Sequence, residues 1–189
     1  MLIYNILVHT PIWVWLLLAF LVSRGVAAMR PKEIAPRRAL IVPAVFLLWG
    51  LAGLIGSQGL GGNLALFAVG AILGLAAGGA LAALAPAPRF IPETGRLAMT
   101  GSPIPLIMIL SAFAVKYAGA VTLAMASDPG AHAEIASALA LAGGVFAGLF
   151  WGRTLTQFRR AFIAAGLYAG WSSLPRLVFT SAPSLERAG

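Results

Sequence analysis

Long apolar stretches, separated by short polar segments, constrain this chain more than any other feature of its sequence. A helix needs roughly 20 mostly apolar residues to cross a bilayer, and five stretches reach or approach that length. Only 10% of the 189 residues are charged and 60% are hydrophobic, whereas about a quarter of the residues in a soluble domain are charged. We therefore expect an all-α fold, a polytopic transmembrane helical bundle in which residues 1–189 form a single domain. The expected spans cover about residues 4–23, 39–56, 64–85, 103–125 and 135–152.

A further apolar segment, residues 161–179, is harder to place. Only 15 residues separate Arg160 from Arg176, which is short for a membrane span. An interfacial helix with Tyr168 and Trp171 at headgroup depth fits this length better. A sixth, tilted or re-entrant span is the alternative.

The basic residues indicate how the spans are oriented. Twelve of the 13 Lys and Arg residues fall on one side of a five-span bundle, and the positive-inside rule makes that side cytoplasmic. The N-terminus is then outside and the C-terminus in the cytoplasm. Orientation also accounts for the net charge of +8, so we expect no nucleic-acid partner. The start of the chain, Met1–Val22, lacks the basic region of a signal peptide and is expected to stay as the first helix.

Two of the expected spans carry glycines at intervals of four residues, which places them along one face of a helix. Small residues let helix backbones approach closely in lipid, where the packing of side chains gains little from the exclusion of water. The sequence therefore predicts a close parallel contact between these two spans, or between copies of the protein. The glycines are Gly70, Gly74 and Gly78 in the third span and Gly144, Gly148 and Gly152 in the fifth.

Lys116 is the most informative candidate for a functional site. It lies near the middle of the fourth span, about 19 Å along a helix that starts near Pro103. A charged lysine at that depth costs at least ~2.5–3.5 kcal/mol, and no Asp or Glu occurs in any expected span to offset it. Loss of its proton, a water-filled cavity or an anionic ligand would accommodate it; snorkelling or an aromatic ring is the structural alternative. We expect Lys116, with the hydroxyl of Tyr117 beside it, to bind a ligand.

Other site chemistries find little support in this sequence. The two histidines, His9 and His132, are weak candidates for a metal site, because neither has a second ligand at a typical spacing. There is no cysteine, which excludes thiol chemistry and cysteine-bound metals. No paired carboxylates or Ser-His-Asp arrangement is present. We therefore expect no catalytic residue, no cofactor and no enzymatic activity.

Three segments resemble those of small multi-pass inner-membrane proteins of proteobacteria that are grouped as a domain of unknown function. The segments are Asn5–Trp15, Ser23-Arg24-Gly25 and Phe113–Tyr117. The resemblance implies an inner-membrane location in a bacterium. It implies no catalytic or binding residue.

Two functions are compatible with these features. The first is a small membrane protein, expected to be oligomeric, that binds or transports a small anionic or amphiphilic solute through Lys116. The second is a non-transporting assembly, sensor or accessory subunit, whose glycine faces dock a membrane partner and whose Lys116 pairs with an acidic residue of that partner. Besides the lipid bilayer, a second copy or a membrane protein is thus the expected partner.

Overall fold

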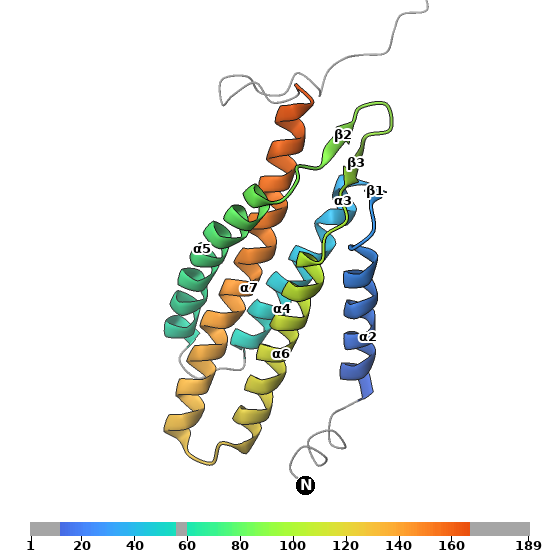
Figure 1. Ribbon diagram of the computed structural model, residues 1–189. Coiled ribbons are helices and arrows are strands. Elements are labelled where there is room, and N and C mark those ends of the chain that lie inside the picture. The colour runs from blue at the N-terminus through green and yellow to red at the C-terminus, as the bar shows by residue number, and fades with distance from the viewer. Residues whose placement is uncertain (1–11, 56–59, 167–189) are drawn as a thin grey trace, which may run out of the picture.

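The computed structural model describes residues 12–55 and 60–166, and most of them are helical (Figure 1). The long helices lie side by side along roughly one direction, and a small sheet lies at one end of the bundle. We call this the sheet end. The helices are α2 (Ile12–Ala27), α3 (Pro36–Ala39), α4 (Ile41–Ile55), α5 (Leu60–Leu84), α6 (Ile104–Met125) and α7 (Pro129–Ala164).

Four helical stretches in the described part of the chain are long and apolar enough to cross a membrane. They are Pro36–Ile55, Gly61–Leu84, Ile104–Met125 and Pro129–Ala164. This confirms a mostly helical molecule that is compatible with a membrane protein. The first expected span, 4–23, corresponds to α2, which has 16 described residues. Residues 4–11 of this expected span lie outside the described part of the chain, so the count of five spans stays a prediction.

The break between α3 and α4 has a local cause in the sequence. Pro43 has no N–H to donate to the carbonyl of Ala39, four residues earlier, so the helical hydrogen bonding is interrupted there. Leu40 keeps helical dihedral angles, and its carbonyl accepts a hydrogen bond of 3.0 Å from the N–H of Ala44. The two helices therefore continue as one stretch of membrane-spanning length.

The all-α expectation is wrong at the sheet end, where three short strands form an antiparallel sheet in the order β1–β3–β2. Strand β1 (Lys32–Ile34) comes from the segment after α2. Strands β2 (Arg89–Ile91) and β3 (Arg96–Met99) form a hairpin between α5 and α6. Gly95 lies in its turn with a φ of 62°, a left-handed conformation that glycine adopts at no steric cost.

Helix α7 is longer than the sequence analysis expected at both ends. It begins at Pro129, where the side chain of Asp128 accepts a 3.0 Å hydrogen bond from the N–H of Ala131 and caps the helix. It continues through Arg153 and Arg160 to Ala164, so the first residues of the segment 161–179 belong to α7 and do not start a separate helix. Residues 167–179 lie outside the described part of the chain.

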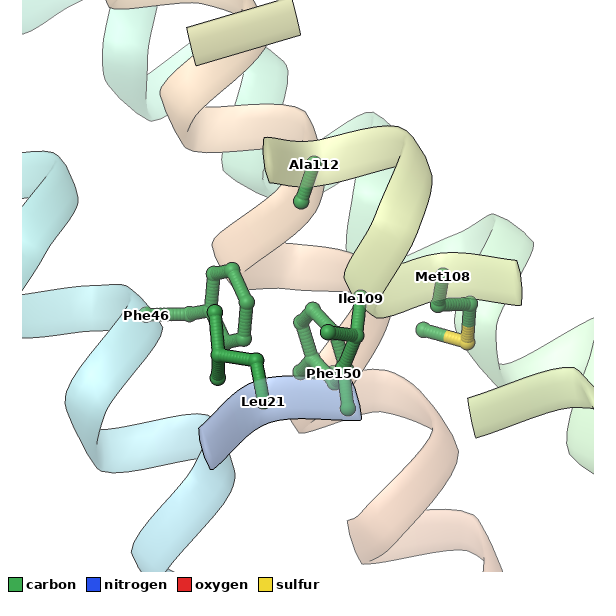
Figure 2. Close-up of a cluster of buried hydrophobic side chains, with 6 residues drawn as sticks. All are labelled: Leu21, Phe46, Met108, Ile109, Ala112 and Phe150. Carbon is green, nitrogen blue, oxygen red and sulfur yellow. The ribbon is translucent and has the colours of Figure 1, made fainter. Parts of the chain in front are cut away.

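Four helices meet in an aromatic and aliphatic core (Figure 2). The rings of Phe46 on α4 and Phe150 on α7 stack with their centroids 4.2 Å apart. Leu21 of α2 and Ile109 of α6 close over these rings, and both side chains are buried. This cluster joins α2, α4 and α6 to α7, whose other side contacts α5. The full cluster is Leu21, Phe46, Met108, Ile109, Ala112 and Phe150.

Candidate functional site

Helices α5 and α7 run parallel and contact each other along the six glycines singled out in the sequence. A Cβ atom added to any of them would overlap a backbone carbonyl oxygen of the opposite helix. Backbone therefore lies directly against backbone over about three helical turns, a close approach that small residues also allow between membrane helices. On α5, Gly70, Gly74 and Gly78 face the carbonyls of Leu141, Val145 and Leu149; on α7, Gly144, Gly148 and Gly152 face those of Phe67, Ala71 and Leu75.

Lys116 extends from α6 toward the interior of the bundle. Its ammonium nitrogen lies 6.0 Å from the centroid of the Trp49 ring on α4. A Cβ added to Gly53 of α4 would lie 3.5 Å from this nitrogen, and one added to Gly143 of α7 would lie 3.2 Å from it. Two glycines on neighbouring helices thus leave the room that the ammonium group occupies.

No carboxylate in the described part of the chain approaches this ammonium group. Helices α4 and α6 contain no Asp or Glu. On α7 the carboxylate closest in sequence to Gly143 is that of Glu134, nine residues earlier, which is about 14 Å along the helix. The ring of Trp49 lies at the outer limit of an effective cation–π contact, about 6 Å, so it offsets the buried charge only in part.

Tyr117, the other predicted ligand-binding residue, contacts a neighbour on its own helix. Its ring stacks on that of Phe113, one turn earlier on α6, with centroids 5.9 Å apart and planes 9° from parallel. Adjacent residues on a helix point about 100° apart, so Lys116 and Tyr117 leave α6 in different directions. Besides this ring stacking, Tyr117 makes another interaction within the chain.

The weak metal candidates form no site in the described residues. His132 is exposed in the first turn of α7, and no group of three or more metal-ligating side chains is present between residues 12 and 166, apart from the undescribed gap 56–59. His9 lies outside the described residues. The first turn of α7 is thus a capped helix start at the end opposite the sheet.

The sequence analysis missed a polar group on α7 near the sheet end. Arg153 is buried, with 6% of its surface exposed, and Gln157 one turn further on is 8% exposed. Within the described part of the chain, Nη1 of Arg153 has no hydrogen-bond partner. Arg160, by contrast, donates from Nη1 to the carbonyls of Ala82 and Ala85, at 2.5 and 2.7 Å, and so caps the end of α5.

A signal for this group is present in the sequence. Arg153, Gln157 and Arg160 are spaced four and three residues apart, the interval that places side chains on one helix face. The fifth expected span ends at residue 152, so the predicted helix did not include these three residues. The spacing predicts that the helix continues, but burial depends on α5 and the sheet, which are distant in sequence.

Comparison with known proteins gives a family and no activity. No curated protein and no solved structure matches the chain. One family model matches residues 1–166, which is most of the chain. This confirms the expectation of an uncharacterised family. The chain belongs to the family described as "Family of unknown function (DUF6622)".

Proposed function

We propose that this chain is a multi-pass protein of a bacterial inner membrane that binds or transports a small anionic or amphiphilic solute through Lys116. The observation that carries the proposal is the ammonium group between α4, α6 and α7 with no carboxylate near it among the described residues. An ionisable residue inside a membrane span indicates function by default, because burying its charge is costly. An anion that binds there restores the missing charge partner.

The distribution of charge supports the orientation. The described basic residues other than Lys116 all lie at the sheet end or in the last turns of α7. The connection from Ala126 to Asp128, at the opposite end, contains no Lys or Arg. By the positive-inside rule the sheet end faces the cytoplasm. With α2 as an additional span, the five helices put the N-terminus outside and the C-terminus inside.

The docking function receives less support from this arrangement. The six glycines are covered by the α5–α7 contact within one chain, so their faces are not free for another protein. What remains of that function is Lys116, which can pair with an acidic residue of a partner. A protein neighbour crosslinked close to Lys116 in intact membranes would favour this second function.

The test compares ligand binding by the full chain and its Lys116→Leu variant in nanodiscs, with native mass spectrometry as the readout. The probes are dodecanoate, an anionic amphiphile, and dodecanol, its neutral counterpart. We expect dodecanoate to be retained and dodecanol not, with binding about tenfold weaker in the variant, as for the loss of one charge-assisted contact. Lys32→Leu removes the other lysine, outside the expected spans, and should leave binding unchanged.

Two results would overturn the proposal. One is equal retention of dodecanoate and dodecanol by the unmodified protein. The other is equal retention of dodecanoate by the protein and by Lys116→Leu. Thermal unfolding of both proteins is measured as a control, because the comparison is valid only if Lys116→Leu is folded. Removing an unpaired buried charge is expected to preserve or raise stability.

A further inference from the structure

Arg153 is a second buried cation, and the proposed function does not use it. Its side chain is more than nine-tenths buried, and one of its terminal nitrogens has no hydrogen-bond partner within the described residues. A guanidinium stays charged in proteins and carries five N–H donors. Leaving these donors unpaired away from water is unfavourable, so Arg153 calls for an acceptor that carries negative charge.

The sheet end of the bundle, near which Arg153 lies, is rich in basic residues. In the described part of the chain, two carboxylates, Glu33 and Glu93, lie at the sheet end, and no ion pair joins either of them to Arg153. Partial burial lowers the pKa of Lys32 below its ordinary value of 10.5, and the positive charge of Arg24 lowers it further. The basic residues at this end are Arg24, Arg30, Lys32, Arg37, Arg38, Arg89, Arg96, Arg153, Arg159 and Arg160.

The depth of Arg153 is compatible with binding the phosphate of a lipid. Its backbone nitrogen lies beside Gly78 of α5, six residues before the helix ends at Leu84, or about 9 Å along the axis. The 25 residues of α5 extend about 37 Å, whereas the hydrocarbon core of a bilayer is about 30 Å thick. The long side chain of Arg153 can therefore extend from the apolar region toward the headgroup region.

We propose that Arg153 binds a phosphate group at the sheet end of the bundle, between α7 and the end of α5. The planar guanidinium offers two parallel N–H donors to two phosphate oxygens. Gln157, buried one turn further along α7, can supply an amide N–H to the same group. Arg160 does not take part, because it caps α5. The phosphate comes from a phospholipid headgroup or from a free phosphate compound.

The test measures retention of short-chain phosphatidylglycerol by the full chain in detergent, using native mass spectrometry. Diacylglycerol of the same chain length is the phosphate-free control. We expect the unmodified protein to retain the phospholipid and not diacylglycerol, and Arg153→Gln to bind it about tenfold more weakly. Arg159→Gln, which removes an exposed arginine of the same helix, should bind it normally. The phospholipid is itself an anionic amphiphile, so each comparison is repeated in the Lys116→Leu background, where the proposed solute site is absent.

Inorganic phosphate separates the two sources. If millimolar phosphate displaces the phospholipid, the site recognises free phosphate as well; if it does not, the site requires a lipid. Either result supports the proposal.

Equal binding by the unmodified protein and Arg153→Gln would overturn it, as would equal retention of phosphatidylglycerol and diacylglycerol. If Arg153→Gln does not fold, hydrogen exchange of the unmodified protein decides whether the phosphate site exists. We expect phosphatidylglycerol, and not diacylglycerol, to slow exchange in α7 around Arg153, and no such difference would reject the site. Because the Lys116→Leu background lacks the proposed solute site, failure of the phosphate site there is distinguishable from failure of the proposed function.

Discussion

At the scale of single residues, the buried polar side chains differ in how their hydrogen-bonding groups are satisfied. The hydroxyl of Ser137 donates to the carboxamide oxygen of Asn63 at 3.0 Å and joins α7 to α5 at the end opposite the sheet. Arg160 is satisfied by two backbone carbonyls at the sheet end. Lys116 is half-buried and Arg153 is buried, and no described carboxylate neutralises either of them. The first two contacts stabilise the fold, and the last two residues carry the proposals.

Replacing Arg160 by Met should destabilise the protein by roughly 1–3 kcal/mol, because the carbonyls of Ala82 and Ala85 would lose their donor. The neighbouring Arg159 is exposed, so Arg159→Met should change stability by less than about 0.5 kcal/mol. Thermal unfolding in detergent, followed by circular dichroism, measures both. Equal effects of the two substitutions would show that the cap contributes no stability.

Sequence reasoning identifies Lys116 as a candidate but does not identify Arg153, for a physical reason. A lysine inside an apolar stretch is conspicuous, because every neighbour in sequence is apolar. Arg153 follows an apolar stretch in the way that basic residues follow spans at the cytoplasmic side, so nothing local distinguishes it from an exposed arginine. Its burial is decided by the end of α5, which lies about 75 residues earlier in the chain.

At the scale of elements, the glycine contact between α5 and α7 is the main packing feature of the bundle. The spacing of four residues is a strong local signal, because it fixes a continuous face on each helix. That signal does not specify which helices meet. The structure places both faces against each other within one chain.

Gly148→Ala should destabilise the protein by roughly 1–3 kcal/mol, because the new methyl group would overlap the carbonyl oxygen of Ala71 and push α5 and α7 apart. Gly62→Ala is the matched control on α5, where a Cβ meets nothing within 4 Å. It should be neutral or stabilising by up to about 1 kcal/mol, as alanine favours helix over glycine. Chemical unfolding of both variants in detergent compares them. A neutral Gly148→Ala would mean that the helices do not meet at this glycine.

The strands and the end of α7 could not be predicted in the same way. Strands of three or four residues are too short for an alternating pattern to be recognised. Their pairing is also non-local, since Glu33 lies opposite Ala98. The bilayer thickness limits the length of the apolar part of a helix, but it does not limit the helix as a whole. Helix α7 therefore continues through residues 153–164. Near its end it packs against the sheet, where the ring centroids of Phe90 and Phe162 lie 5.1 Å apart.

At the scale of the whole molecule, the apolar stretches predict a helical bundle, and charge predicts its orientation. The first prediction follows from the cost of placing unpaired backbone groups in lipid, which only helices and closed barrels avoid. It holds for the four long apolar helical stretches of the described residues. The second depends on the surrounding membrane and has a direct test.

The absence of cysteine makes that test simple, since a single introduced cysteine is unique in the chain. Ser127→Cys places a thiol in the connection between α6 and α7, and Thr94→Cys places one in the hairpin turn between β2 and β3. We expect a membrane-impermeant maleimide to label the Ser127→Cys variant in intact spheroplasts, and the Thr94→Cys variant only after lysis. Labelling of the hairpin in intact spheroplasts would reverse the proposed orientation.

The α5–α7 contact also has a consequence for biosynthesis. Helix α5 ends at Leu84 and α7 at Ala164, so 80 residues separate the completion of the two helices on the ribosome. At about 5–20 residues per second, this corresponds to a delay of roughly 4–16 s. During that time the glycine face of α5 has no α7 against it. The contact between α5 and α7 is therefore completed only once α7, the last described helix, has been synthesised.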